Sequence, residues 1–303
     1  MASRSACILS LLWTLAWQPA SSAVPLEPAA FTLEEGDRVV FLGNSFFERA
    51  LDYGHLETSM MLHWKRRDIT FRNLGWDGDT VYGHSRAGGR RRQVFGDPEE
   101  GFQRMLRHLT TLRPTVVFLA YGFNESFDGS AGIPSFRQGL KRLMDQIVRL
   151  EARLVILTPP QVPAGKASLH ASLKLYADVM LEAAMEGGHR AIHLFGMDAL
   201  NDPAFRENKL HLSKAGYRKV SDIIADALDF PPPILPMNTP AANIIRRAIV
   251  RKNTLYFHRW RPRNDAFVYG ERKNEQQIAQ EEPAQLEPLI AKQEKRIQRL
   301  LQK

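Results

Sequence analysis

Short apolar runs alternate with longer amphipathic segments along the first three quarters of the chain. Five short runs rich in apolar and β-forming residues predict strands, at 38–42, 69–73, 115–120, 153–157 and 191–195. Helical spacing of apolar residues predicts helices between and after them, at 46–64, 98–112, 136–152, 169–186 and 215–228. Strands that are continuously apolar indicate a sheet covered on both faces. We therefore predict a three-layer α/β/α sandwich over residues 36–230, with a mostly parallel, flavodoxin-like central sheet.

A change of composition marks the end of this domain. Three consecutive prolines occupy 231–233, and the chain beyond them is richer in basic and aromatic residues. Residues 243–251 have helical spacing, 254–269 are aromatic and basic, and 282–303 are charged with regularly spaced apolar residues. We expect 231–303 to be a Pro-rich linker and a helical, basic C-terminal extension that packs on the main domain or on a partner.

The N-terminal segment has the three parts of a secretory signal. Arg4 gives a positive start, Ala6–Trp17 is mostly apolar, and Ser21-Ser22-Ala23 offers small residues for cleavage. The alternative is a single membrane anchor, but a run of about 12 apolar residues is short of the ~20 that span a bilayer. We expect a signal peptide at 1–23, cleavage after Ala23 and a secreted or periplasmic protein. Residues 24–35 are then a lead-in segment, and no later stretch is apolar enough to be an integral membrane segment.

Composition narrows the possible chemistry. The chain is 44% hydrophobic and 24% charged, as in globular proteins. Its single cysteine, Cys7, lies in the predicted signal peptide. A mature chain without a thiol has no cysteine nucleophile, iron–sulfur cluster or zinc–thiolate site, and we expect no cofactor.

The net charge is +8, with a local cluster at Arg86, Arg90, Arg91 and Arg92. Such a cluster can bind nucleic acid. Export favours the alternative, a solvated basic loop that contacts anionic polymers at most, so we expect no nucleic-acid partner.

Four polar segments stand beside the ends of predicted elements. Ser45 follows the first strand, glycines 75 and 78 follow the second, Asn124 follows the third, and His211 precedes the helix at 215–228. A serine at a helix start, glycine amides open to a substrate, an asparagine amide and a histidine can supply a nucleophile, oxyanion donors and a base. Taken singly, each is more often a helix cap, a turn or a surface residue.

Together, these segments carry a family resemblance. The series Gly-x-Ser45, Asn73 followed by Gly78-Asp79-Thr80, Gly-x-Asn124, and His211 before a Gly-Tyr helix resembles the SGNH or GDSL-type hydrolase superfamily, over residues 38–228. The resemblance implies that Ser45 is the nucleophile and His211 the general base. It also implies an oxyanion hole made of the Ser45 and Gly78 backbone N–H groups and the Asn124 amide. The expected activity is hydrolysis of carboxylic esters through an acyl-enzyme.

Two positions depart from the family pattern. Asn44 replaces an aspartate before the nucleophile, and Asn208 replaces the aspartate three residues before the histidine. Asn208 can orient an imidazole by accepting its N–H, but it cannot stabilise the imidazolium by charge. Glu207 or Asp202 could supply a carboxylate instead. We predict an exported serine esterase, with O-acetyl groups on glycans as candidate substrates. The alternative is a catalytically weak or inactive binding module for an acylated polymer or a protein partner.

Three other groups of residues remain as minor candidates. His55 and His63, with Asp52 and Glu57, lack the paired-histidine spacing of zinc hydrolases, so we expect no metal site. The segment 259–261, Arg-Trp-Arg, could stack on a sugar or nucleobase, but an interdomain packing patch is the favoured interpretation. Four aromatic residues near the predicted site suit a bulky ester or belong to the core: Trp76, Tyr121, Phe123 and Phe127.

Overall fold

Five parallel strands form one sheet at the centre of the computed structural model, in the order β2-β1-β3-β4-β5. The strands are β1 (Arg38–Gly43), β2 (Thr70–Gly75), β3 (Val116–Ala120), β4 (Arg153–Leu157) and β5 (Arg190–Ile192). This is the predicted flavodoxin-like order. Since every strand runs the same way, the loops after the strands all emerge at one rim of the sheet.

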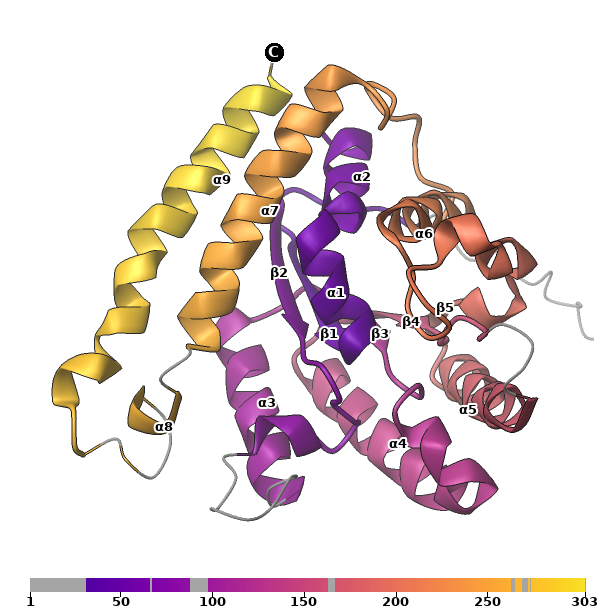
Figure 1. Cartoon of the computed structure of the whole chain (residues 1–303). Helices are drawn as coiled ribbons and strands as arrows, with labels where there is room; N and C mark the ends of the chain where they lie inside the picture. Colours follow the sequence, from indigo (N-terminus) through magenta and orange to yellow (C-terminus); the bar gives the residue numbers. More distant parts are fainter. Residues whose placement is uncertain are drawn as a thin grey trace, which may run out of the picture. The chain divides into compact units, whose positions relative to one another are not determined.

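Helices cover both faces of the sheet (Figure 1). Val39 and Phe41 of β1 join an apolar cluster with α1, α2 and α6, whereas Val40 and Leu42 join a second cluster with α3, α4 and α5. The predicted three-layer sandwich is thereby confirmed. The helices are α1 (Ser45–Tyr53), α2 (His55–His63), α3 (Pro98–Leu112), α4 (Ile133–Arg149), α5 (Ala167–Glu186) and α6 (Lys214–Ala227).

Two predicted elements of the sheet domain differ most clearly from the structure. The helix expected over 46–64 is two helices, because Gly54 takes a left-handed φ of +66° and ends α1. The last strand ends at Ile192, and the chain turns at Leu194–Gly196 into a short 3-10 helix, η3. The other 3-10 helices are η1 (His84–Arg86), η2 (Glu125–Gly132), η4 (Asp198–Asn201), η5 (Pro203–Phe205), η6 (Gln277–Gln280) and η7 (Glu282–Leu286).

The C-terminal extension packs on the sheet domain. Its helices are α7 (Pro240–Trp260), α8 (Asp265–Val268) and α9 (Glu287–Leu301), and α7 is longer than predicted. In Figure 1, α7 lies between α9 and the α1–α2 pair, beside the edge strand β2. Its buried residues Ala242, Ile245 and Ile249 belong to the same apolar cluster as the α1 side of the sheet. The extension therefore completes the core of the domain.

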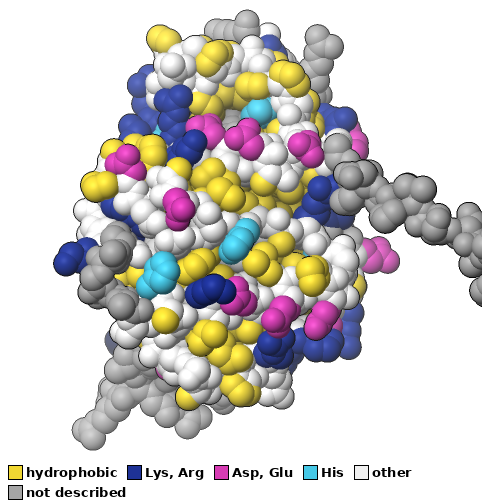
Figure 2. All heavy atoms as spheres, turned by 90° about the vertical axis from the view of Figure 1, so that its right-hand side faces the viewer, with side chains coloured by type: hydrophobic (Ala, Val, Ile, Leu, Met, Phe, Trp, Pro, Cys, Tyr) yellow, Lys and Arg dark blue, Asp and Glu magenta, His cyan; other side chains and the backbone are white. Residues whose placement is uncertain are grey.

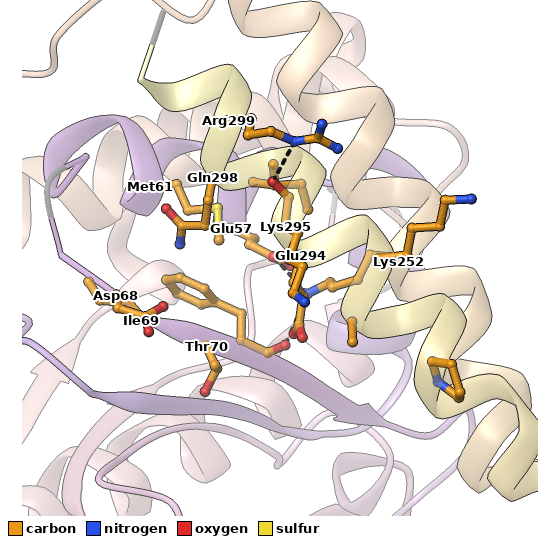
Figure 3. A pocket seen from close by; sticks show the side chains of 15 residues that line it. Glu57, Met61, Asp68, Ile69, Thr70, Lys252, Glu294, Lys295, Gln298 and Arg299 are labelled. Atoms are coloured by element: carbon orange, nitrogen blue, oxygen red, sulfur yellow. Dashed lines mark hydrogen bonds and ion pairs between the residues drawn. The ribbon is translucent and has the colours of Figure 1, made fainter.

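A buried ion pair ties α7 to α2 and β2. Lys252 Nζ lies 2.7 Å from Glu57 Oε1 and donates to the carbonyl of Phe71 at 3.0 Å. The side chains of Lys252 and Glu57 are only 1% and 4% exposed. The pair borders a cavity of about 1020 Å³ beneath α9 (Figure 3). This cavity includes the start of β2 at Thr70, so it is separate from the rim where the strands end.

The structure describes residues 31–65, 67–87, 98–162, 167–262, 265–268, 272 and 274–302. The predicted signal peptide, most of the lead-in segment and the arginines at 90–92 lie outside these residues. Within them, none of the helices combines the length and apolar character needed to span a membrane.

Candidate active site

Four predicted residues meet at the rim where the strands end. Ser45 and His211 line one narrow cavity. The backbone N–H of Gly78 donates to Ser45 Oγ at 3.3 Å. The side-chain amide of Asn124 donates to the carbonyl of Asp79 at 2.7 Å, which places it beside the Gly78 loop. The structure thus brings together loops that are up to 166 residues apart, counting from Ser45 to His211.

Ser45 is the first residue of α1 and is 5% exposed. Asn44 caps this helix, because its side-chain oxygen accepts the N–H of Phe46 at 3.1 Å. Gly43 lets β1 approach β3 closely, since a Cβ there would lie 2.2 Å from the carbonyl oxygen of Ala120. The free N–H groups and the positive dipole end of α1 favour negative charge at this point. The Asn44 substitution therefore keeps the local geometry that presents the serine.

The loop after β2 carries the second candidate oxyanion donor, the backbone N–H of Gly78. Gly78 has a left-handed φ of +72°, which other residues rarely adopt. This backbone conformation accompanies an amide that points at the serine hydroxyl. Gly75 has a different role, because a Cβ there would lie 2.2 Å from the backbone nitrogen of Glu48. It allows α1 to pack directly on the end of β2.

A carboxylate outside the predicted site residues contacts the candidate nucleophile. The hydroxyl of Ser45 donates to Asp77 Oδ1. The backbone N–H of Asp77 in turn donates to the carboxylate of Glu48, on the first turn of α1. Its sequence signal is weak, because Asp77 is the residue before Gly78 in a loop whose Gly-Asp-Thr carries the family pattern. Its role depends on the contact between two strand-end loops.

Two of the side chains proposed as hydrogen-bond partners of the His211 ring accept backbone N–H groups instead. Asn208 Oδ1 accepts the backbone N–H groups of Leu210 and His211, at 2.8 and 2.9 Å. Asp202 Oδ1 accepts the backbone N–H of Ala204 at 2.8 Å. Asn208 therefore shapes the loop that carries His211, and Asp202 caps η5.

The third proposed partner, Glu207, also interacts with side chains other than that of His211. Its carboxylate pairs with Arg49 and accepts the hydroxyl of Tyr53 at 3.1 Å. The short helix α1 thus contributes both the candidate nucleophile and an arginine that holds the loop before His211. In this arrangement Glu207 acts on His211 through its charge, and not as the hydrogen-bonding carboxylate that was one of the alternatives.

The imidazole of His211 has a lowered pKa. Burial is the main cause, because it disfavours the charged ring, and the positive charge of Arg49 adds to it. The negative charges of Asp77 and Glu207 act in the opposite direction. A lowered pKa keeps the ring neutral near pH 7, the form that can accept a proton.

The cavity beside Ser45 is small and mostly apolar. Its volume is about 30 Å³, which is room for about two water-sized groups. The aromatic and proline side chains on its walls are those of Phe46, Tyr121, Phe123, Pro159, Pro160 and Tyr217.

The four aromatic residues near the site divide between core and surface. Trp76 and Tyr121 are 7% and 1% exposed and belong to the core. Phe123 lines the cavity and meets the ring of Phe127 edge-on, with centroids 5.7 Å apart. Phe127 is 59% exposed. The outer ring of this pair therefore faces solvent.

For Arg86, the expectation of a solvated basic loop is wrong. Its side chain is fully buried, and its Nε lies 2.6 Å from Asp79 Oδ2. Tyr121 donates to the same carboxylate oxygen at 3.0 Å. Arg86 is therefore a structural cation behind the Gly78 loop. Figure 2 also shows acidic side chains interspersed with the lysines and arginines on the face it presents.

The segment 259–261 is a packing patch, as favoured from the sequence. Trp260 is 4% exposed and meets Trp76 edge-on, with centroids 5.4 Å apart. Arg261 pairs with Glu48 at 2.5 Å.

Of the residues considered as a metal site, Glu57 is held by Lys252 and Asn253. Among the described residues, no group of three or more His, Cys, Asp or Glu is placed to hold a metal ion.

Comparisons with known proteins agree with this fold. Residues 41–219 match the model of the GDSL-like Lipase/Acylhydrolase family. Comparison with curated proteins gave no match. Among solved structures, a lipase/acylhydrolase from Enterococcus faecalis is 18% identical, with a TM-score of 0.50 over 66% of this chain and 100% of that one.

Two further solved structures are similar. A catalytic mutant of Axe2, an acetylxylan esterase from Geobacillus stearothermophilus, is 14% identical, with a TM-score of 0.54 over 66% of this chain and 97% of that one. LAE5, an alpha/beta hydrolase from the metagenome of Lake Arreo, Spain, is 16% identical, with a TM-score of 0.53 over 66% of this chain and 98% of that one. At these identities the likeness establishes a shared fold.

Proposed function

Since the chain belongs to the GDSL-like lipase/acylhydrolase family, we propose that it is a serine esterase that cleaves small acyl groups from alcohols. One observation carries the proposal: the Ser45 hydroxyl lies 3.3 Å from the Gly78 amide, in a cavity that His211 also lines. A nucleophile, an oxyanion donor and a base are the minimum set for acyl transfer.

The proposed reaction has two halves. His211 accepts the proton of Ser45 Oγ, and the oxygen attacks the ester carbonyl carbon. The carbonyl oxygen becomes an oxyanion, which the N–H groups of Ser45 and Gly78 and the amide of Asn124 stabilise. The C–O bond to the alcohol then breaks, the alcohol leaves with the proton from His211, and an acyl-enzyme remains. Water gives a proton to His211, attacks the acyl carbon and releases the acid, and the proton returns to Ser45.

The substrate we propose is an O-acetyl ester on a glycan. The cavity of about 30 Å³ suits an acetyl group, and the exposed ring of Phe127 stands beside its Phe123 wall. The solved neighbour Axe2 is an acetylxylan esterase. A signal peptide at 1–23 would bring the enzyme to extracellular glycans, and N-terminal sequencing of the exported protein tests this: we expect it to begin at Val24.

Turnover of p-nitrophenyl acetate tests the chemistry. We expect hydrolysis by the wild type and by Ser135→Ala, an exposed serine on α4, but not by Ser45→Ala. A fluorophosphonate should label the wild type at Ser45. Equal turnover by wild type and Ser45→Ala would end the proposal.

The second candidate function is an acyl-polymer binding module without catalysis. It is favoured by one observation, that Asn208, Glu207 and Asp202 are each bonded elsewhere. It predicts no labelling of Ser45, together with saturable binding of an O-acetylated glycan. Labelling at Ser45 with turnover would exclude it.

A further inference from the structure

The C-terminal extension reaches the candidate active site. The family match ends at residue 219, and α7 begins only at Pro240. Yet Arg261, directly after α7, lies beside the loop that carries Gly78. Its Nη1 is 2.5 Å from Glu48 Oε2, and its guanidinium lies 4.2 Å from the centroid of the Trp76 ring.

The contact with Glu48 leads to the nucleophile in two steps. The Glu48 oxygen that pairs with Arg261 also accepts the backbone N–H of Asp77. Asp77 accepts the Ser45 hydroxyl, and the amide of the next residue, Gly78, points at that same hydroxyl. Glu48 and Arg261 are 23% and 25% exposed, so solvent screens their attraction less than that of a fully exposed pair.

The contact with Trp76 holds the other side of the loop. Arg104 lies 5.2 Å from the centroid of the Trp76 ring, and Trp260 packs on the ring edge-on. Cations near an indole ring are attracted to its face. The residue that begins the Gly78 loop is thus fixed between α3 and the end of α7.

We propose that Arg261 is a positioning residue for the esterase site: it holds the loop 76–78 at the distance from Ser45 that an oxyanion donor requires. The inference rests on the proposed function, because it concerns the same Gly78 amide. It gives the extension a role in activity besides its packing on β2. Small displacements of an oxyanion donor lower the rate strongly, because the transition state forms the stronger hydrogen bond.

Arg259, in the last turn of α7 and two residues before Arg261, offers a matched control. It pairs with Glu287 at 2.8 Å and is 30% exposed, close to the 25% of Arg261. Arg261→Gln, Arg261→Lys and Arg259→Gln would be compared in the full chain, with p-nitrophenyl acetate as substrate. We expect Arg261→Gln to lower kcat about tenfold to a hundredfold, since losing a whole oxyanion donor costs about 10²–10³-fold. KM should stay within about twofold, because the loop acts in the transition state.

Rescue and coupling separate positioning from a general loss of stability. Arg261→Lys should recover part of kcat, and Arg259→Gln should match the wild type. Glu48→Ala and Arg261→Gln should be non-additive in kcat/KM, since they act through one contact. A kcat in Arg261→Gln equal to that of Arg259→Gln, with the wild-type Tm, would overturn the proposal.

A readout without substrate keeps this inference distinct from the proposed function. Amide hydrogen exchange in the peptide that contains 76–80 should quicken in Arg261→Gln but not in Arg259→Gln. If the wild type hydrolyses no ester, the proposed esterase function fails. Faster exchange in Arg261→Gln would still support the proposal that Arg261 positions the loop 76–78. Unchanged exchange in Arg261→Gln would overturn the positioning role of Arg261, even if the wild type hydrolyses esters.

Discussion

The hydroxyl of Ser45 donates to the carboxylate of Asp77, one residue before the glycine whose amide points at the same hydroxyl. This contact holds the hydroxyl of the proposed nucleophile, and the negative charge of Asp77 favours the protonated form of His211. Asp77→Asn should therefore lower kcat at least about tenfold, a smaller effect than the roughly 10²–10⁴-fold contributed by a group that transfers the proton itself. Initial rates with p-nitrophenyl acetate test this.

Asp145→Asn is the control for that experiment. Asp145 is exposed on α4 and pairs only with Lys141, one turn away, among the contacts the structure describes. We expect it to leave kcat unchanged. Full activity in Asp77→Asn would mean that the Ser45–Asp77 contact has no part in turnover.

The pH dependence of kcat/KM should report the lowered pKa of His211. The ring must be neutral to accept a proton, so activity is present above its pKa and is lost as pH falls through it. The midpoint of the acid limb should therefore lie below the ordinary value of 6.5. Arg49→Gln removes a cation that lowers this pKa, so the limb should move to higher pH; Asp77→Asn should move it to lower pH.

The comparison for Arg49 is Arg137→Gln. Arg137 forms an exposed ion pair with Glu182 at 2.8 Å, away from the site. Its acid limb should coincide with that of the wild type. A limb that moves to lower pH in Arg49→Gln would contradict the electrostatic argument.

Asn208 should matter through the loop and not through the imidazole. Its side-chain oxygen accepts the N–H groups of Leu210 and His211. Asn208→Asp keeps both bonds and should retain wild-type kcat within about threefold, whereas Asn208→Ala loses them and should lower kcat about tenfold, since misplacing a catalytic group is costly. A large gain in Asn208→Asp would show instead that its carboxylate reaches the ring.

Phe127 should contribute to recognition of the alcohol part of the substrate. The ring is 59% exposed beside Phe123, which lines the cavity. Phe127→Ala should raise KM for an acetylated xylo-oligosaccharide several-fold and leave KM for p-nitrophenyl acetate unchanged. Met185→Ala, at an 80% exposed apolar residue on α5, serves as the control. If Phe127→Ala and the wild type had equal KM values for the oligosaccharide, Phe127 would not be part of the substrate site.

The buried pair of Lys252 and Glu57 should be important for stability. Burial raises the pKa of Glu57, and the Lys252 charge opposes this. Lys252→Ala leaves the carboxylate buried without its cation, so the free energy of unfolding should fall by about 3–5 kcal/mol, the usual cost of breaking such a pair. Urea unfolding measures it, with Lys292→Ala on the surface of α9 as control. A loss below about 1 kcal/mol would contradict the argument.

Much of the framework could be predicted because it depends on neighbours in sequence. The run 116–120 is buried along its whole length, as its unbroken apolar character indicated. The positions of Ser45 and Gly78 at strand ends followed from local patterns as well. Gly54 was the exception within α1–α2: its left-handed φ accompanies close packing, since a Cβ there would lie 2.8 Å from Val250 of α7.

By itself, the sequence determined the layered parallel fold and the loops that would meet at the rim, because apolar periodicity and turn residues act over short distances. Only the tertiary structure decided which charges meet. Arg86 was expected in solvent and is buried on Asp79, and Arg261 reaches Glu48 across more than two hundred residues of chain. Charged side chains are long and take whichever partner packing brings near, so their pairing depends on the whole fold.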